Sequence, residues 1–385
     1  MKRRYRLALT AAILVGSGLG AWALTAIGTS TEGPLESLFS RLGSAVAGAE
    51  DATVGRFREP GRRRDLAWFE PYRSNAGRLR NPDRLLVGAF DNAMPSSFDG
   101  ALRLERALGT TFPLLQLYVA WGDKPEHRFP LEALTAIDRL GSVAMITWEP
   151  WLATFEGARH PQLPVPESRD RHGLAQVASG AYDFYIDAWA ADAARYGKPV
   201  FVRLAHEMND AYRYPWGPQH NTKEGFIAAW RHIVRRVQNA GATNVIWVWS
   251  PHVAYQYWEL YYPGAEYVDW VATGVLNFGP IAQWSQWWTF DEIFGKHYAQ
   301  LASFRKPVMI AEFGSLAVGG DRAAWYDKAL RSLPRDYPAV RAILFFNVMG
   351  DQTVTYQRVD WTVTGDSTLV PVIAAALAAS QGTGR

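Results

Sequence analysis

Short apolar segments alternate with amphipathic stretches along most of this 385-residue chain, and this alternation constrains the fold more than any other feature. Eight segments have the length and the β-branched or aromatic content of buried strands. They cover residues 85–90, 114–119, 143–147, 200–204, 245–249, 268–273, 308–311 and 342–346. Strands that are apolar along their whole length indicate a parallel sheet with helices on its outer surface.

Helical patterns lie between most of these strands. They cover residues 100–108, 131–140, 174–196, 223–240, 290–302, 321–332 and 370–378, whereas the pattern at 258–262 is unclear. Eight strand–helix units in about 300 residues predict the α/β class and a (β/α)8 TIM barrel. The alternative is a doubly wound open sheet, which a glycine-rich phosphate loop after the first strand would favour. The run Gly88-Ala89-Phe90-Asp91 is not such a loop.

The first 28 residues have the pattern of an export signal. Residues 1–6 are strongly basic and residues 7–28 carry no charge, over a length that can cross a bilayer. We therefore expect residues 1–28 to be a signal peptide or a membrane anchor whose basic end faces the cytoplasm. A spacer over 29–64 and a barrel domain over 65–385 complete the expected organisation. The expected location is membrane-anchored in the periplasm or cell envelope, or secreted.

Charge and cysteine content exclude several classes of protein. The formal net charge is +3, and much of the basic surplus lies in residues 2–4 and 62–64, so no nucleic-acid-binding surface is expected. The chain has no cysteine, which excludes disulfides and thiolate nucleophiles. Its eight histidines show no metal-ligand spacing. We therefore expect neither a metal nor a cofactor.

Two glutamates follow strands on opposite sides of the expected barrel. Glu207 comes after the fourth strand and Glu312 after the seventh, so both are expected at the mouth, where such barrels carry their active sites. Burying a carboxylate costs several kcal/mol unless it is paired, so each glutamate is either part of a structural ion pair or functional. Cleavage of a glycosidic bond requires two such groups, one protonated and one ionised.

Aromatic residues are unusually frequent: the chain has 17 Trp, 17 Tyr and 18 Phe. Aromatic side chains fill cores well, which is one explanation. Several tryptophans, however, fall near predicted strand ends and loops, where a flat indole could stack on a sugar ring. The candidates for this role are Trp121, Trp151, Trp216 and Trp284.

Two segments around these glutamates resemble the catalytic segments of glycoside hydrolase family 26. They read Arg203-Leu204-Ala205-His206-Glu207-Met208-Asn209 and Lys306-Pro307-Val308-Met309-Ile310-Ala311-Glu312-Phe313-Gly314-Ser315, and shorter similar runs lie at 146–151, 247–251 and 267–271. The resemblance covers roughly residues 84–377. It implies a retaining barrel enzyme with Glu207 as acid/base and Glu312 as nucleophile. Substrate-side positions would be Arg203, His206, Asn209, Tyr212 and Asn277.

The chain also departs from that family. Leu276 stands where many members have a tyrosine that hydrogen-bonds the nucleophile, and Tyr212 stands where mannanases often have tryptophan. The nucleophile would then depend on other support, such as Arg203. The implied substrates are β-mannan, mixed-linkage β-glucan or a bacterial exopolysaccharide.

A second class of function is a catalytically silent carbohydrate-binding barrel. Tethered to the membrane by residues 1–28, such a barrel would assist exopolysaccharide export. In either case the expected partners are a polysaccharide, the membrane and a polysaccharide synthesis or export system. The arrangement of Glu207 and Glu312 at the mouth is the observation that separates the two classes.

Overall fold

The computed structural model describes residues 61–354 and 356–382, all of which belong to one compact unit, Glu59–Arg385. The predicted signal or anchor segment and most of the predicted spacer lie outside the described residues. Within the described part of the chain, no helix has both the length and the apolar character needed to cross a membrane.

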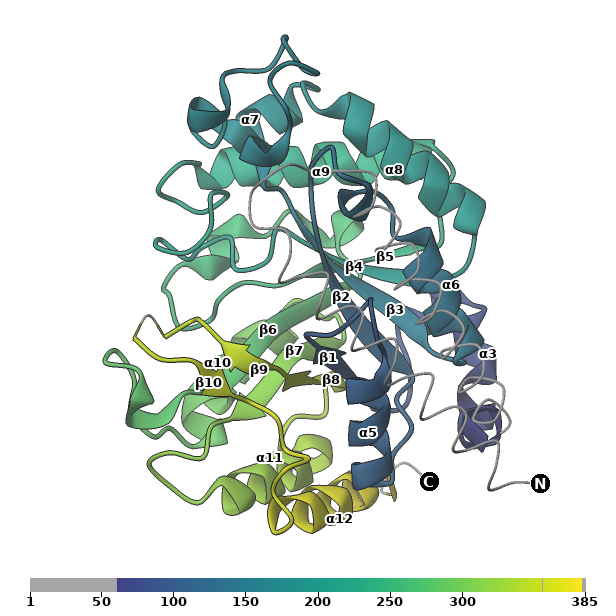
Figure 1. Cartoon of the computed structure of the whole chain (residues 1–385), viewed down its shortest axis with the longest axis vertical. Coiled ribbons are helices and arrows are strands. Elements are labelled where there is room, and N and C mark those ends of the chain that lie inside the picture. Colours follow the sequence, from purple (N-terminus) through teal and green to yellow (C-terminus); the bar gives the residue numbers. More distant parts are fainter. Residues whose placement is uncertain (1–60, 355, 383–385) are drawn as a thin grey trace, which may run out of the picture. The chain divides into compact units, whose positions relative to one another are not determined.

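Eight parallel strands form a closed barrel in which each strand pairs with the next and β8 pairs with β1 (Figure 1). The strands are β1 (Leu86–Asp91), β2 (Leu114–Ala120), β3 (Val143–Glu149), β4 (Val200–Leu204), β5 (Val245–Trp249), β6 (Trp270–Asn277), β7 (Val308–Ser315) and β8 (Val340–Asn347). All eight predicted strands and the barrel are confirmed, and the open sheet is excluded. Strands β3, β6 and β7 extend further toward the mouth than predicted.

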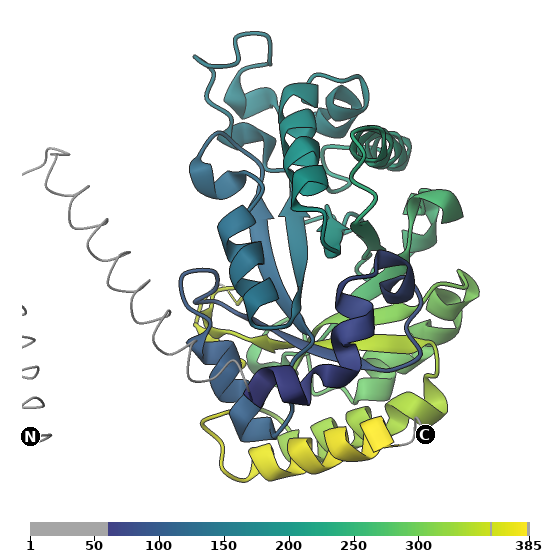
Figure 2. The same ribbon diagram turned by 90° about the vertical axis from the view of Figure 1, so that its right-hand side faces the viewer.

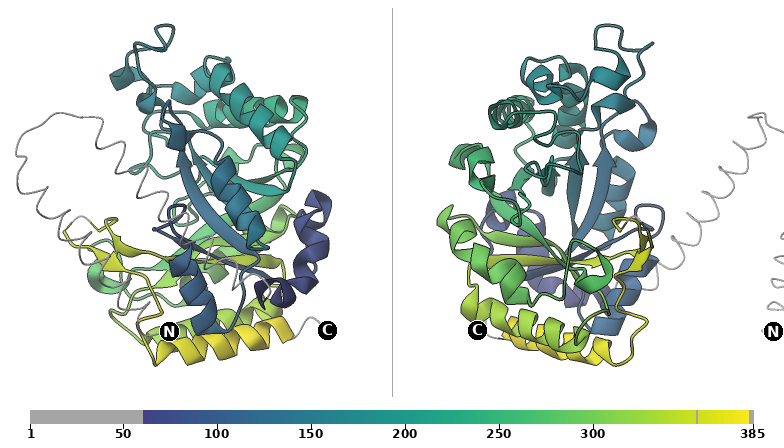
Figure 3. Two further views of the ribbon diagram at one scale, coloured as in Figure 1. Left: turned by 45° about the vertical axis from the view of Figure 1, so that its right-hand side comes forward. Right: turned by 90° about the vertical axis from the view of Figure 1, so that its left-hand side faces the viewer.

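Helices surround the barrel on its outside (Figure 1). They are α5 (Asp99–Leu108), α6 (Leu131–Arg139), α7 (Gly173–Ala178), α8 (Asp183–Tyr196), α9 (Lys223–Asn239), α10 (Lys296–Ser303), α11 (Arg322–Asp336) and α12 (Leu369–Gly382). The single helix predicted over 174–196 is wrong: α7 and α8 are separate, with Gly180 between them at φ +93°, which helices do not adopt. Helix α12 packs against α11 and α5, which closes the ring of helices (Figure 3).

Between β5 and β6 the described chain forms two short 3-10 turns, η5 (Trp258–Tyr261) and η6 (Ala265–Tyr267), in place of an α-helix. The unclear pattern at 258–262 therefore corresponds to the first of these turns.

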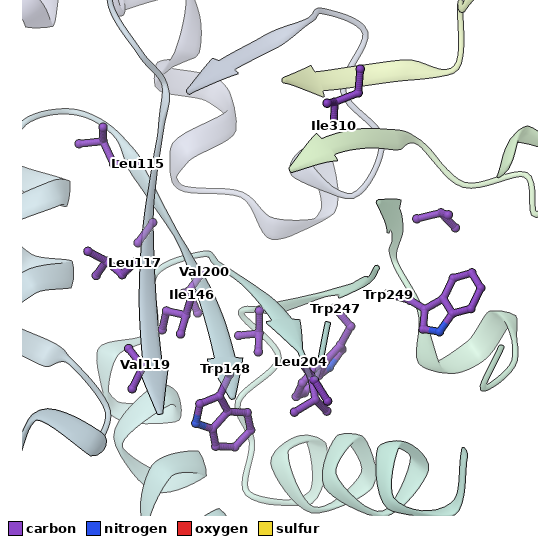
Figure 4. Packing of buried hydrophobic residues seen from close by; sticks show 14 of the residues in the cluster. Leu115, Leu117, Val119, Ile146, Trp148, Val200, Leu204, Trp247, Trp249 and Ile310 are labelled. Atoms are coloured by element: carbon purple, nitrogen blue, oxygen red, sulfur yellow. The ribbon is translucent and has the colours of Figure 1, made fainter. Parts of the chain in front are cut away.

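Side chains alternate along β2 between the two faces of the barrel wall. Leu115, Leu117 and Val119 pack outward in the large core shared with the helices (Figure 4). Gln116 and Tyr118 alternate with them and therefore point into the barrel. The lower interior is filled by apolar side chains of several strands, namely Leu86, Met145, Phe201, Ile246, Trp270 and Met309.

The N-terminal end of the barrel is closed by a segment that includes α3 (Glu70–Arg73) and α4 (Ala76–Leu79), drawn in purple in Figure 2. Arg80 donates from Nε to Asp269 Oδ1 at 3.0 Å, and from Nη2 to the carbonyls of Thr243 and Val245. The Trp270 indole donates to the carbonyl of Leu79 at 2.9 Å. This end is therefore both packed and hydrogen-bonded.

Arg62 was predicted to lie in the spacer but is part of the packed domain. It is buried and forms an ion pair with Glu105 of α5, with Nε 3.0 Å from Oε2. The packed domain therefore includes residues before the predicted boundary at 65.

Candidate active site

Glu207 is held at the end of β4 by an unusual backbone. Ala205 and Glu207 adopt left-handed conformations, at φ +43° and +51°. The amide of Glu207 donates to the carbonyl of Ser250, after β5, at 2.7 Å. Left-handed backbone at non-glycine residues costs roughly 1 kcal/mol or more each and tends to occur at functional sites. In this chain the left-handed turn brings the Glu207 amide to the carbonyl of Ser250, at the end of β5.

Glu312 depends on a β-bulge in β7. Ile310 and Phe313 pack outward, while Met309 and Ala311 point into the barrel. Strict alternation would therefore place Glu312 on the outer surface. The register shifts here, because Thr273 pairs with Ile310 whereas the next residue of β6, Gly274, pairs with Glu312. The extra residue brings Ala311 and Glu312 to the inside in succession, as bulges near active sites do.

The two carboxylates meet above Gly274, which has no side chain to separate them. The position where a side chain would begin on Gly274 lies 3.7 Å from Glu207 Oε1 and 3.7 Å from Glu312 Oε2. These two oxygens are therefore separated by at most twice that distance. This limit accommodates the separation of about 5–5.5 Å found in retaining glycosidases.

One oxygen of Glu312 is bound by two donors. Its Oε1 accepts from the Tyr118 hydroxyl at 2.6 Å and from Arg203 Nη2 at 2.6 Å. Arg203 Nη2 also contacts the Tyr118 oxygen at 2.9 Å, and Arg203 Nε donates to Thr147 Oγ1. Burial alone would raise the pKa of Glu312, but Arg203 and then Tyr118 outweigh it and lower that pKa. Glu312 is therefore ionised, with Oε1 engaged and Oε2 directed toward Gly274.

Glu207 has the opposite environment. It is 6% exposed, and its Oε2 has no hydrogen-bond partner among the described residues. Burial raises the pKa of Glu207, and the negative charge of Glu312 adds to this, against the opposing effects of His252 and Arg213. Arg213 lies 3.9 Å away, from Nη1 to Glu207 Oε2. The surroundings therefore favour the protonated form of Glu207 and the ionised form of Glu312.

A third carboxyl, Glu149 at the end of β3, lies beside this pair. Its Oε2 accepts from the Trp151 indole at 3.0 Å, and burial raises its pKa. His206 lies next to it, with Nε2 2.9 Å from the Tyr214 hydroxyl. Burial, together with Arg203 and Arg213, lowers the pKa of His206 well below its usual range, so its imidazole is neutral. Glu149 Oε1 lies 3.9 Å from His206 Nδ1, so these two side chains are neighbours.

Some of the predicted sugar-binding residues are accessible. Tyr212 in the loop after β4 is 80% exposed, and Trp284 in the loop after β6 is 66% exposed. Trp151 is partly buried, and its ring contacts Trp216 edge-on. These three positions remain predicted stacking sites.

Other predicted substrate residues are wrong, because their side chains are buried or already bonded. Trp121 is completely buried against Trp148, so neither face of its ring can meet a sugar. Trp216 is 2% exposed, stacks on Tyr214 and donates to the carbonyl of His206. Trp216 therefore holds the backbone of His206 in place through this hydrogen bond.

Two predicted polar contacts are also structural. Asn277 is completely buried; its amide bonds to the Ser315 hydroxyl and accepts from the backbone of Gly279 and Trp288. Asn209 bonds both backbone groups of His252 at 2.8 Å, which joins the loops after β4 and β5. Arg203 is completely buried and donates to Glu312, which is the support of the nucleophile expected of it.

Three residues of the site were not predicted: Tyr118, Arg213 and Tyr214. Tyr118 lies within β2, whereas the predicted site residues were taken from the segments that follow each strand. The signal that could have identified it is the alternation of Gln116 and Tyr118 with leucines and valine in the same strand. Tyr118 provides the hydroxyl that Leu276 lacks, since it donates to Glu312.

A closed (β/α)8 barrel has the architecture of a glycoside hydrolase when two adjacent glutamates at its mouth have pKa values shifted in opposite directions. The family model for glycosyl hydrolase family 26 matches residues 177–315, which include both glutamates. The chain belongs to that family.

Relatives agree with this assignment. Endoglucanase H of Acetivibrio thermocellus is 32% identical over 274 residues, which are 68% of this chain and 28% of that protein. Mannan endo-1,4-beta-mannosidase A and B of Caldalkalibacillus mannanilyticus is 28% identical over 184 residues, 45% of this chain and 32% of that protein. The chain therefore spans about a third or less of the length of these two curated relatives. The mannanase BCman structure from Bacillus subtilis has the same fold, with a TM-score of 0.52, 21% identity, and 76% and 88% of the two chains covered.

Proposed function

We propose that this protein is a retaining endo-β-glycanase that cleaves a β-linked polysaccharide by double displacement. The observation that carries the proposal is the opposite proton affinity of two adjacent carboxyls: burial raises the pKa of Glu207, whereas Arg203 and Tyr118 lower that of Glu312 against burial. A retaining glycosidase requires this division between a proton donor and an ionised nucleophile.

In the first step Glu312 Oε2 attacks the anomeric carbon, and the bond from that carbon to the glycosidic oxygen breaks. Glu207 gives its proton to the departing oxygen, so the leaving sugar departs as an alcohol. In the second step Glu207, now ionised, takes a proton from water. The water oxygen attacks the anomeric carbon and Glu312 departs as a carboxylate. Each glutamate ends in its starting protonation state.

Tyr118 and Arg203 keep Glu312 ready for attack. Both bind Oε1, which leaves Oε2 for the anomeric carbon. Burial and the neighbouring Glu312 raise the pKa of Tyr118 well above its usual range, so its hydroxyl stays a donor. Many family 26 members have a tyrosine after β6 that hydrogen-bonds the nucleophile. In this chain Tyr118 on β2 would make that hydrogen bond.

The proposed substrates are β-mannan, mixed-linkage β-glucan or an exopolysaccharide of the same cell. The names of the two relatives, an endoglucanase and a mannan endo-1,4-beta-mannosidase, support the first two. The uncharged run at 7–28 supports the third, because an enzyme anchored in the cell envelope meets polymer that its own cell exports. Exposed Tyr212 and Trp284 would stack on sugar rings of the chain being cut.

The test is a panel of β-mannan, mixed-linkage glucan, cellulose, xylan and the host exopolysaccharide, scored for released oligosaccharides. We expect the protein to release oligosaccharides from at least one polymer and Glu312→Gln to release none. If wild type binds a polymer but never cleaves it, the silent carbohydrate-binding barrel replaces this proposal. Cell fractionation tests the location: a purely cytosolic protein would contradict envelope anchoring and secretion.

A further inference from the structure

Three side chains that can bind a metal lie together at the mouth: Glu207 and two residues that the reaction above does not use, Asp210 and His252. Glu207, Asp210 and His252 each offer one ligand atom, and these atoms lie within 4.8 Å of one another. They come from two loops, after β4 and after β5. The Asn209 side chain forms hydrogen bonds with the backbone N–H and C=O of His252. These bonds join the two loops and fix the backbone positions of the cluster residues relative to each other.

Two residues of the cluster, Glu207 and His252, each have a buried side-chain atom without a hydrogen-bond partner. Glu207 Oε2 and His252 Nδ1 are inaccessible to solvent, and neither has a hydrogen-bond partner among the described residues. A buried polar atom without a partner is destabilising, and a bound ion is one of the arrangements that would satisfy it. Because Glu207 is more than nine-tenths buried, this oxygen lies deep in the mouth, where it receives no hydrogen bond from the described residues.

The local charge is compatible with a cation. Two carboxyls, Glu207 and Asp210, face one guanidinium, that of Arg213, whose Nη1 is 3.9 Å from Glu207 Oε2. Arg213 Nη2 donates to the Thr353 hydroxyl at 2.6 Å. Arg203 does not oppose a cation here, because it is paired with Glu312. When a metal displaces the proton of Glu207, two carboxyl groups face the single guanidinium of Arg213.

We infer that Glu207, Asp210 and His252 form a site for a divalent transition metal, with Zn²⁺ as the best-fitting ion. One imidazole and two carboxylates match the nitrogen and oxygen ligands of Zn²⁺, whereas Ca²⁺ requires six or more oxygens. Zinc bonds of about 2.0–2.1 Å need closer ligand atoms, so small side-chain rotations accompany binding. Three protein ligands leave the fourth position to water.

Metal binding would switch off the proton donor. Zinc displaces the proton of Glu207 to solvent and occupies the oxygen lone pair that would hold it. A glycosidic oxygen can then receive no proton from this residue. Reversible inhibition rests on the proposed function, but binding of the metal does not.

Calorimetric titration of Zn²⁺ into the untagged full-length chain, stripped of metal with a chelator, tests the site. We expect one equivalent to bind. His252→Gln and Asp210→Asn should each weaken the affinity by about tenfold or more, since loss of a direct ligand exceeds the loss of an outer-shell partner. His172→Gln, which removes an exposed histidine at the start of α7, is the matched control and should bind as wild type does.

Thermal unfolding without metal shows whether each variant is folded. Because two ligand variants are made, the test still works if one of them does not fold. The proposal is overturned if wild type binds no zinc, or if His252→Gln and Asp210→Asn both bind like the control. Zinc titrations of activity give an independent result. If zinc binds through these residues but no polysaccharide is ever cleaved, the metal site stands and the proposed function fails. If cleavage occurs and zinc inhibits wild type and both ligand variants equally, the metal site fails alone.

Discussion

The two ends of the barrel satisfy their polar groups in opposite ways. At the N-terminal end Arg80 is paired with Asp269 and bonds two carbonyls, and the Trp270 indole finds the carbonyl of Leu79. At the mouth Glu207 has a left-handed backbone and an unpartnered buried oxygen. One end is thus built for stability, whereas the other keeps strain and unmet hydrogen-bonding capacity that a substrate can use. Substitutions at the two ends should therefore affect different quantities.

The largest effect is expected from Glu312→Gln at the mouth. The amide keeps the shape of the side chain but is a poor nucleophile, so kcat/KM on the polysaccharide should fall by about 10⁴-fold or more. Steady-state kinetics measures this loss. Glu132→Gln on the exposed face of α6 is the control and should keep full activity. A Glu312→Gln variant with more than a tenth of wild-type activity would remove Glu312 from the mechanism.

Glu207→Gln should produce a loss that depends on the leaving group. On the polysaccharide, where the departing oxygen needs a proton, we expect a decrease of about 10²–10⁴-fold. On an aryl glycoside with an acidic phenol the decrease should be much smaller, because that phenolate leaves unaided. Parallel assays on the two substrates provide the measurement. Equal losses on both would show that Glu207 is not the proton donor.

Tyr118→Phe should give a smaller loss of activity and a shift in its pH profile. The active form needs Glu312 ionised, so activity is lost as the pH falls through the pKa of Glu312. The Tyr118 hydrogen bond lowers that pKa, so its removal should move the acid limb of kcat/KM to higher pH. A bond to a charged group is worth about 1.5–3 kcal/mol, so a loss of roughly tenfold or more in kcat/KM is expected along with this shift.

The pH profile distinguishes this role from a structural one. If Tyr118 only fills space, phenylalanine should leave the acid limb where it is in wild type. The basic limb reports deprotonation of Glu207, whose raised pKa extends activity upward, and this limb should stay in place in the variant.

The smallest effect is expected at the N-terminal end. Arg80→Met removes an ion pair and two bonds to carbonyls, and should lower the free energy of unfolding by about 1–3 kcal/mol without changing kcat. Arg305→Met is the matched control, because this exposed guanidinium forms no ion pair within the described residues, and its effect should stay within about 0.5 kcal/mol. Denaturant unfolding and steady-state kinetics measure both quantities. A large fall in kcat for Arg80→Met would contradict the separation of the two ends.

The sequence predicted the barrel well because continuous apolar strands and helical periodicity are local signals. It also placed Glu207 and Glu312 correctly at the mouth, since both follow such strands. It did not predict the bulge in β7, because the extra residue appears only in the pairing with β6. The pairing of Tyr118 with Glu312 was missed for a similar reason: 194 positions separate the two residues, and only barrel closure brings them together.

Tryptophan positions show the opposite error. Trp121 and Trp216 lie near strand ends, as predicted, but their rings pack inward against Trp148 and Tyr214. Sequence position locates a residue near the mouth but does not determine which way its ring turns. Trp284, in a longer loop, is exposed. The exposure of each tryptophan therefore depends on the rings that pack against it, and the sequence did not predict these packing partners.

The configuration of the first product tests the central claim most directly. Proton NMR of a freshly started hydrolysis resolves the anomeric signals of the product before mutarotation mixes them. Double displacement through Glu312 with Glu207 as acid/base predicts that the new reducing end first appears with the β configuration of the substrate bond. Initial appearance of the α anomer would show single displacement by water and would contradict Glu312 as the nucleophile.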